Sequence, residues 1–215
     1  MDGEPGRDCP RCPRLAKWRD ALRLQYPSWH NAPVPSFGPL SARLLIVGLA
    51  PGLRGANCTG RPFTGDYAGD LLYATLAKFG LAEGNYQARA DDGLSLNQVR
   101  ITNAVRCVPP ENKPVPGEIA ACRGFLQQEL AQLPDLRAIL ALGQIAHQQV
   151  GAVLGVKRKD LPFRHGGITM VPRHQDRPPL IVAASYHCSR YNTNTGRLTT
   201  AMFEAAFTAL LPLLA

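Results

Sequence analysis

The sequence predicts an α/β fold, a three-layer α/β/α sandwich with a central four-stranded parallel sheet. Four short apolar runs have the length of strands that are buried on both faces, and segments with helical patterns separate them. Strands that alternate with helices along a chain form parallel sheets that are covered by helices on both sides. The strands are expected at residues 43–48, 99–105, 138–142 and 180–184.

Helices are predicted between these strands and after the last one. Gly80 follows the first helical segment, Glu118 lies near the start of the second, and an apolar stripe that includes Phe203 runs along the fourth. The third segment directly follows the third strand. These helices are expected at residues 70–79, 116–133, 144–153 and 198–211.

Two proline-containing stretches interrupt the alternation. Residues 26–39 are expected to form an irregular arm, and residues 157–179 a basic loop around a candidate short strand at 168–171. A chain of 215 residues, of which 45% are hydrophobic, has room for one well-buried core. We therefore expect a single domain over residues 1–215, with an N-terminal arm over residues 1–39.

The charge balance favours a polyanionic partner. Lys and Arg exceed Asp and Glu by eight, and the isoelectric point is near 9.5, which makes nucleic acid the first candidate. A genome biased toward arginine explains the same excess. No run approaches the roughly 18 apolar residues that span a bilayer, and Asp2, Glu4 and Asp8 precede any apolar segment, unlike in a signal peptide. We expect a cytoplasmic protein without a membrane partner.

The cysteines are more consistent with a metal site than with disulfides, because the cytosol keeps thiols reduced. A C-x2-C pair lies near the N-terminus, and two further cysteines flank the turn and helix start after the second strand. Four thiolates satisfy either a zinc site or a [4Fe–4S] cluster, and the residues alone leave both open. The four are Cys9, Cys12, Cys107 and Cys122.

The candidate functional residues follow the strands, where ligand sites of parallel sheets lie. After the first strand, glycine-rich segments from Gly48 onward allow close backbone approach to a ligand. They also carry Phe63, a flat surface for a base, and Asp66, which suits either a water and positive charge or a plain helix N-cap. At the end of the second strand, the Asn103 amide suits a base edge or a turn. His187 follows the fourth strand.

Two rival classes remain open at this point. One is a non-enzymatic nucleic-acid-binding protein with structural zinc. The other is an enzyme acting on free nucleotides, which the absence of a standard phosphate-loop spacing disfavours. Neither Cys58 nor Cys188 belongs to an arrangement typical of a catalytic cysteine.

Four motifs together resemble the family 5 uracil-DNA glycosylases of bacteria and archaea. They read GLAPG, GRPFTGD, TNAVRC-VPP and SYHCSRYNTNTGRLT, and with the cysteines they cover nearly the whole chain. The resemblance implies a uracil-DNA glycosylase-like fold. It also implies that the four cysteines hold a [4Fe–4S] cluster in place of zinc and tie in the N-terminal arm.

The resemblance further implies a role for each residue of the site. The sister family 4 has a catalytic glutamate where this chain has Leu49, so the charge for sugar and water would come from Asp66. Phe63 would stack on the extruded base, Asn103 would contact its edge, and His187 would polarise it as it leaves.

Further contacts are expected around these groups. The first turn would approach the base at Gly48 and Ala50, and Ser189, Arg190 and Arg197 would contact DNA. Where the family commonly reads HPS, this chain reads HCS. Because proline fixes φ, its absence is expected to loosen this loop.

The activity implied is monofunctional hydrolysis of the N-glycosidic bond of uracil and other deaminated or damaged bases, in base excision repair. Hypoxanthine and ethenocytosine are implied substrates, and thymine in mismatches is a further candidate. Neither motif contains lysine, so a Schiff-base step is not expected and the product is an abasic site. The expected partner is double-stranded DNA, with single-stranded DNA as a second candidate, and the protein is expected to be a monomer.

Overall fold

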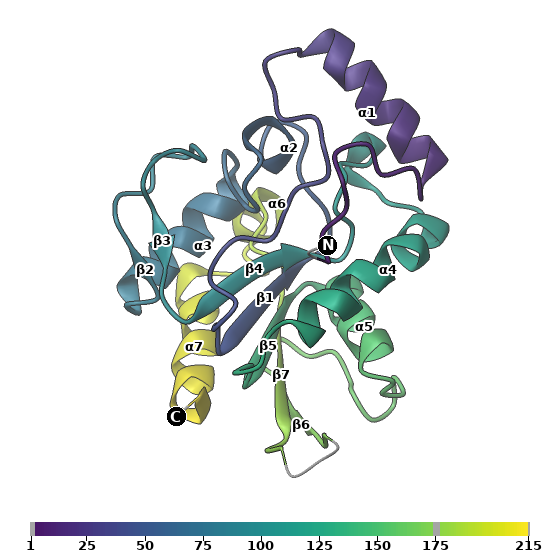
Figure 1. Ribbon diagram of the computed structural model, residues 1–215. Coiled ribbons are helices and arrows are strands. Elements are labelled where there is room, and N and C mark those ends of the chain that lie inside the picture. Colours follow the sequence, from purple (N-terminus) through teal and green to yellow (C-terminus); the bar gives the residue numbers. More distant parts are fainter. Residues whose placement is uncertain (1–2, 174–176, 215) are drawn as a thin grey trace.

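A five-stranded sheet forms the centre of the computed structural model, which describes residues 3–173 and 177–214 (Figure 1). The strand order is β4-β1-β5-β7-β6. The first four strands are parallel, as predicted, whereas β6 pairs with β7 antiparallel. The candidate strand at 168–171 thus makes the sheet five-stranded rather than four-stranded. The strands are β1 (Leu44–Gly48), β4 (Val99–Asn103), β5 (Ala138–Leu142), β6 (Ile168–Val171) and β7 (Leu180–Ser185).

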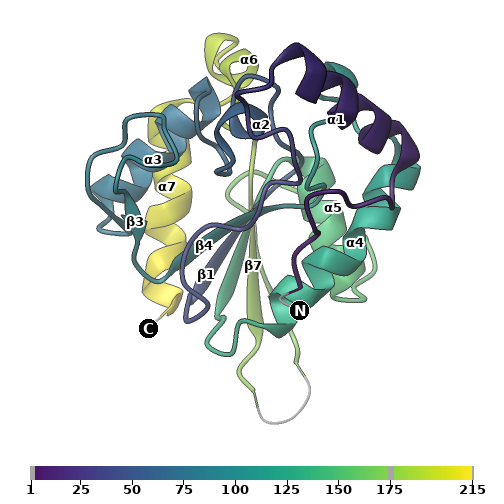
Figure 2. The ribbon, with the colours of Figure 1, turned by 45° about the horizontal axis from the view of Figure 1, so that its top comes forward.

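Two helical layers enclose the sheet (Figure 2). One contains α3 (Tyr67–Lys78) and α7 (Thr200–Leu210), and the other contains α4 (Pro116–Ala131) and α5 (Gln144–Val153). Alternate residues of a strand face opposite layers. In β1, Leu44 and Ile46 pack into the core with α3 and α7, whereas Leu45 and Val47 pack into the core with α4 and α5. This two-sided burial explains why the strands read as continuous apolar runs.

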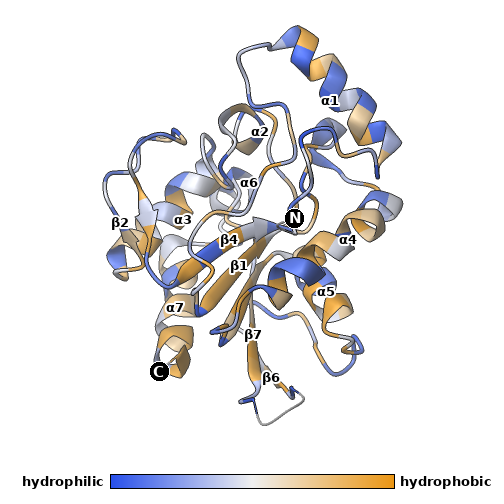
Figure 3. Ribbon diagram, viewed as in Figure 1, coloured by the Kyte–Doolittle hydropathy of each residue, from blue (hydrophilic) through white to orange (hydrophobic). Residues whose placement is uncertain are grey.

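Hydropathy follows the same layers (Figure 3). The strands are predominantly hydrophobic, and every residue of β1, β5 and β7 is buried. Burial of apolar surface stabilises such a core by roughly 25 cal/mol per Å² removed from water. Among the described residues, no helix has both the length and the apolar character needed to cross a membrane.

Smaller elements lie at the carboxyl end of the sheet and at one of its sides. Helix α1 (Pro13–Gln25) was not predicted from the sequence, and it lies near α4 (Figure 1). Loop segments carry two short helices, α2 (Ala56–Thr59) and α6 (Arg190–Asn194), and a hairpin of β2 (Ala82–Glu83) and β3 (Ser95–Leu96). The 3-10 helices are η1 (Pro110–Asn112) and η2 (Leu211–Leu214).

The start of α3 differs from the expectation in a way that concerns function. The helix begins at Tyr67 rather than at residue 70, because Asp66 accepts a hydrogen bond from the Gly69 amide and serves as its N-cap. The strand that precedes it and this cap together place the GRPFTGD segment at the carboxyl edge of the sheet.

Candidate active site

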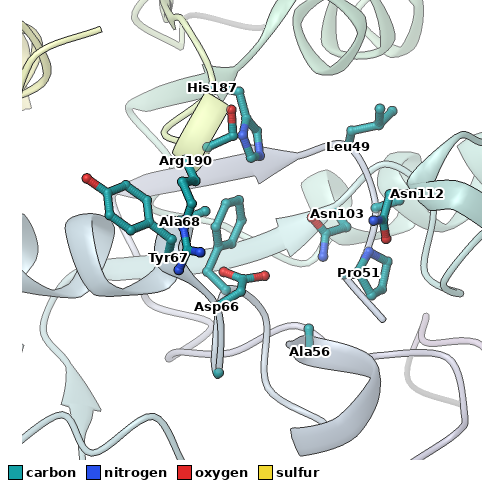
Figure 4. Close-up of a pocket in the computed structure, with 15 residues that line it drawn as sticks. Leu49, Pro51, Ala56, Asp66, Tyr67, Ala68, Asn103, Asn112, His187 and Arg190 are labelled. Carbon is teal, nitrogen blue, oxygen red and sulfur yellow. The ribbon is translucent and has the colours of Figure 1, made fainter. Parts of the chain in front are cut away.

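A pocket of about 580 Å³ lies beyond the carboxyl ends of β1, β4 and β7. It has the size of typical small-molecule sites. Figure 4 shows the Asp66 carboxylate and the Asn103 amide facing the same space, with Asn112 on the same side as Asn103. Seven of the residues expected from the sequence line this one pocket: Ala50, Phe63, Asp66, Asn103, His187, Ser189 and Arg190.

Gly48 lies beneath the floor of the pocket, next to Asn103. The parallel register places Gly48 beside Asn103. A Cβ atom on Gly48 would meet the Asn103 Oδ1 atom and lie 2.6 Å from Cζ of Phe63. Gly48 therefore does not line the cavity itself, and its lack of a side chain gives the Phe63 ring and the Asn103 amide their places.

Phe63 adopts a backbone conformation that a residue with a side chain rarely takes. Its φ is +51°, in the left-handed region, and its side chain is almost fully buried. Such a conformation costs about 1–3 kcal/mol and persists where the surroundings hold it. The ring lies 5.9 Å from the His187 ring, at an interplanar angle of 28°. The two rings form an aromatic wall of the pocket.

The Asp66 carboxylate uses its two oxygens differently. Oδ1 accepts the Gly69 amide at 3.1 Å, which confirms the N-cap alternative. Oδ2 lies against Gly52 and Gly55, where a Cβ on Gly52 would approach it to 3.0 Å. The carboxylate as a whole lines the pocket. Capping and a place in the pocket are therefore compatible, because one oxygen anchors the group and the other remains available to a ligand.

His187 is held although the proline that commonly follows it is missing. The Asn192 side-chain amide donates to the His187 carbonyl at 2.8 Å, and Cys188 is fully buried with its thiol 3.4 Å from the Ala68 carbonyl. Ser189 is the N-cap of α6, because its hydroxyl oxygen accepts a hydrogen bond from the backbone amide of Asn192. These contacts hold the loop at His187 without a proline at position 188, and the loosening expected from the missing proline stays a prediction.

The electrostatics favour a neutral His187 ring. Burial lowers the pKa of His187, and the Asp66 carboxylate opposes this by raising it. A neutral imidazole has one N–H donor and one acceptor nitrogen. The ring can therefore donate a hydrogen bond into the pocket without bringing a charge there.

The structure separates two of the expected residues from this pocket. Arg197 lies beside it, in a neighbouring cavity of about 340 Å³ that shares Leu49 and His187 with the first. Its guanidinium lies over the Tyr186 ring, 4.6 Å from the centroid. Gly48 lies beneath the floor, as described above. Both are adjacent to the site without lining it.

Sequence reasoning missed Asn112, whose amide lines the pocket opposite Asp66 (Figure 4). It lies in η1, after a pair of prolines, and has a φ of +57°. Asparagine tolerates this region better than most residues, so a turn is the ordinary explanation of this residue type in such a segment. Tyr67, at the start of α3, also lines the pocket and was missed.

A second, smaller cavity is lined by the four cysteines of the predicted metal site. Cys9 and Cys12 come from the N-terminal arm, Cys107 from the segment after β4, and Cys122 from α4. Burial is the largest cause that raises the pKa of Cys12 to about 11 and that of Cys107 to about 12, and the neighbouring cysteines Cys9 and Cys122 contribute to both shifts. The shared cavity brings the four cysteines together from three separate parts of the chain.

The surroundings of the thiols supply N–H groups that point at sulfur. The Arg106 amide donates to Cys122 Sγ at 3.3 Å, and the Arg19 guanidinium lies 4.0 Å from Cys107 Sγ. Residues 3–173 and 177–214 contain no group of three or more His, Cys, Asp or Glu arranged around a single metal ion. Leu49 and Ala50 pack against the apolar cluster that contains the cysteines, so this region adjoins the first loop of the pocket.

Comparison with known proteins identifies the family. The sequence pattern described as the uracil DNA glycosylase superfamily matches residues 35–211. A type-5 uracil-DNA glycosylase of Thermus thermophilus is 46% identical over 204 residues, which are 91% of this chain and 89% of that protein.

More distant relatives fit the same picture. A type-5 uracil-DNA glycosylase of Pyrobaculum aerophilum is 40% identical over 89% of this chain and 83% of its own length. A type-4 uracil-DNA glycosylase of the same organism is 34% identical over 72% of this chain and 65% of its own. The chain therefore belongs to the uracil-DNA glycosylase superfamily and, within it, to the type-5 uracil-DNA glycosylases.

Proposed function

We propose that this DNA glycosylase of DNA repair removes uracil and, in addition, hypoxanthine, ethenocytosine and mismatched thymine, leaving an abasic site. The observation that carries the proposal is the single pocket in which Phe63, Asp66, Asn103 and His187 meet. A base must leave the duplex to reach such a pocket, at a cost of roughly a few kcal/mol that is smallest for mismatched bases.

Base recognition would rest on Phe63 and Asn103. The Phe63 ring offers a face for stacking, and the buried Asn103 amide offers a donor and an acceptor to a base edge. Every base has a π face, so stacking tolerates many substrates. Leu49 lines the pocket at the position of the family 4 glutamate and brings no polar group there. A pocket of this kind suits a broad range of damaged bases.

The chemistry requires stabilisation of two developing charges. As the bond between C1′ and the base nitrogen breaks, its electrons leave with the base and the sugar becomes oxocarbenium-like. Asp66 Oδ2 would face the sugar, hold the attacking water and accept its proton. The neutral His187 would donate a hydrogen bond to an oxygen of the departing anion. Groups positioned in advance at developing charge supply large transition-state stabilisation.

We also propose that Cys9, Cys12, Cys107 and Cys122 hold a [4Fe–4S] cluster. A cluster has a cysteine at each of four irons, so its ligands surround a volume, and the four thiols line one cavity in this way. When bound, the cluster would supply a structural staple between the N-terminal arm and α4. The N–H groups of Arg106 and Arg19 would stabilise the ligating sulfurs.

DNA would approach over the rim that carries Ser189, Arg190 and Arg197. Arg190 and Arg197 are exposed, and the net charge of +8 adds a long-range attraction to phosphate. We propose that the protein acts as a monomer on double-stranded DNA and also accepts single-stranded DNA. Analytical ultracentrifugation with and without oligonucleotides tests this, and a stable dimer that binds DNA would contradict it.

Excision assays on duplexes with uracil, hypoxanthine, ethenocytosine or mismatched thymine test the proposed substrates. All four are expected to yield alkali-labile abasic sites. Asp66→Ala should lower single-turnover excision by about 10²–10³-fold, whereas Asp70→Ala, which removes an exposed carboxylate in the first turn of α3, serves as the matched control. Full activity of Asp66→Ala would contradict the catalytic role proposed for Asp66. Excision of uracil alone would contradict the proposed broad range of substrates.

Asn103→Ala tests base reading separately from chemistry. Loss of the Asn103 amide should change the order in which the four bases are preferred as well as their excision rates, because the amide contacts only some base edges. An unchanged ranking and rate would contradict the assignment.

The cluster proposal is tested by metal analysis of the purified protein. Iron, acid-labile sulfide and visible absorbance are expected, and they should be lost in Cys107→Ser but kept in Cys58→Ser. Zinc in place of iron would contradict the proposal.

A further inference from the structure

An exposed loop between β2 and β3 is attached to the Phe63 segment by two inward-pointing side chains. Residues 84–93 lie outside helices and strands, and most of them are exposed. Tyr86 and Asp92 are among the exceptions, since the Asp92 carboxylate is fully buried and Tyr86 is half-buried. Both reach residues of the GRPFTGD segment, which is distant from them in the sequence.

Tyr86 contacts the backbone on both sides of Thr64. Its hydroxyl accepts the Gly65 amide at 3.3 Å and donates to the Phe63 carbonyl at 3.4 Å. Its ring stacks on that of Tyr73, with centroids 4.6 Å apart, and the Tyr73 hydroxyl donates to the Pro62 carbonyl at 2.7 Å. Backbone polar groups from residue 62 to residue 65 are thus bound by two stacked tyrosines.

Asp92 holds the same segment through a buried ion pair. Its two oxygens accept hydrogen bonds from the two terminal nitrogens of Arg61, each at 2.7 Å. The Nε atom of Arg61 donates to Thr64 Oγ1 at 2.8 Å. The Arg61 side chain is 4% exposed and its guanidinium lies over the rings of Phe37, Tyr73 and Tyr86. Asp92 also accepts backbone amides of its own loop, from Gln87 and Leu94, at 3.0 Å.

We propose that Tyr86 and Asp92 are positioning residues of the glycosylase reaction, which act by holding the backbone of the Phe63–Asp66 segment. The inference rests on the proposed role of Phe63 in stacking on the base. The observation that carries it is the combination of a left-handed Phe63, whose φ is +51°, with hydrogen bonds of the Tyr86 hydroxyl to the Phe63 carbonyl and to the Gly65 amide, the polar backbone groups that directly follow Phe63. Neither residue lines the pocket, so neither touches the substrate.

The physical reason is that Phe63 would relax without these contacts. A phenylalanine in the left-handed region is less stable than in an ordinary conformation, and only its surroundings keep it there. Relaxation would turn the ring away from Gly48 and move Asp66, three residues later, relative to the sugar. A misplacement of about 1 Å can lower a rate by about 10²-fold, so a partial release is expected to cost roughly tenfold.

The test is a double-mutant cycle of Tyr86→Phe and Phe63→Leu on single-turnover excision of uracil from a duplex. Tyr86→Phe removes the hydroxyl and keeps the ring stacked on Tyr73. We expect it to lower the excision rate roughly tenfold, with unchanged affinity for a duplex that carries a non-cleavable uracil analogue. In the Phe63→Leu background, which is itself impaired, the same change should have a smaller effect than in the wild type, because the stacking ring is gone and only the placement of Asp66 is left to lose.

Each outcome of the cycle decides a different statement. A wild-type rate for Tyr86→Phe, or an effect that multiplies fully with that of an impaired Phe63→Leu, overturns the positioning role and leaves the stacking role intact. A wild-type rate for Phe63→Leu overturns the stacking role in the proposed function, and the positioning inference with it.

Further variants separate positioning from a general loss of stability. Asp92→Asn should reproduce the rate loss of Tyr86→Phe at temperatures well below its Tm, and an unchanged rate would overturn the role of Asp92. Asp91→Asn is its matched control, because that neighbouring carboxylate is exposed and pairs only with the exposed Arg89 in the described contacts. Tyr26→Phe controls for the loss of a tyrosine hydroxyl in a stacked pair, since Tyr26 stacks on Trp29 away from the pocket.

Discussion

Two walls of the pocket carry the reactive groups and are built in contrasting ways. The 61–66 segment holds Phe63 and Asp66 through a buried ion pair, two tyrosine hydroxyls and a helix cap. The 187–194 segment holds His187 through one amide contact and a buried thiol, and its helix α6 has no buried residue. Tyr191 in α6 is 72% exposed.

The contrast indicates that the two walls have different functions. Groups that face the sugar and the base gain most from being fixed before the substrate arrives, because the ordering cost is then met during folding. Groups that meet the DNA backbone must instead be reachable, which requires an exposed segment. The 61–66 segment has the first property, and the rim with Arg190 has the second.

The largest expected effect comes from breaking the buried pair of the first wall. Arg61→Leu leaves the Asp92 charge buried without its partner, which should cost about 3–5 kcal/mol, or roughly 10 °C in Tm. Arg197→Leu, at the exposed side, should change Tm little. Differential scanning calorimetry measures both, and equal changes would contradict the contrast between the walls.

A smaller effect is expected from Asn192→Ala in the second wall. It removes the hydrogen bond to the His187 carbonyl, which is worth about 1 kcal/mol, and should lower single-turnover excision about fivefold with little change in Tm. Asn194→Ala, at the end of the same helix, is the control. A full-rate Asn192→Ala variant would show that Cys188 alone suffices to hold the loop.

The two walls should also be linked through proton binding. Because burial depresses the pKa of His187, its ring should titrate below the usual value of about 6.5, as followed by NMR of the imidazole. Asp66→Asn removes the charge that opposes burial, so it should lower the pKa of His187 further. A rise of this pKa in the variant would contradict the arrangement.

The same pKa shift fixes the sign of a pH effect on stability. The unfolded chain binds a proton at His187 near pH 6.5, whereas the folded chain does so only at lower pH. Stability contributed by neutral His187 is therefore present above pH 6.5 and is lost as pH falls toward the folded pKa. His187→Gln should remove this part of the slope.

The smallest effect is expected on DNA affinity. Arg190→Ala removes the proposed phosphate contact and should reduce the slope of log K against log salt by about one. Arg89→Ala, in the exposed loop on the other side of the first wall, should leave the slope unchanged. Fluorescence anisotropy at several salt concentrations measures it, and an unchanged slope for Arg190→Ala would place DNA elsewhere.

The parts of the fold that burial dictates could be read from the sequence. β5 and α5 have the predicted bounds because an apolar run followed by a helical pattern has few alternatives. Helix α1 escaped prediction because its buried face includes Arg19 beside Leu15 and Leu22, so it has no continuous apolar stripe. The order and direction of β6 depend on pairing across the sheet, which the sequence does not display.

The residues of the site likewise fall into those that could be predicted from the sequence and those that could not. Asp66, Asn103 and His187 stand directly after strands or before a helix, so the parallel topology alone brings them together. Tyr86 and Asp92 lie in a stretch without periodicity, and the Asp92 partner Arg61 is 31 residues away. Their function depends on tertiary contacts, and a single sequence carries no sign of such a pairing.

The glycine beneath the pocket floor restricts how the pocket can be altered by directed evolution. Any side chain at Gly48 would collide with Asn103 and Phe63. Substitution of Gly48 therefore cannot be used to enlarge or reshape the cavity. Leu49, Ala56 and Asn112 line the pocket with side chains of their own. A library selected for new base preferences should therefore return changes at these three positions and keep the glycine.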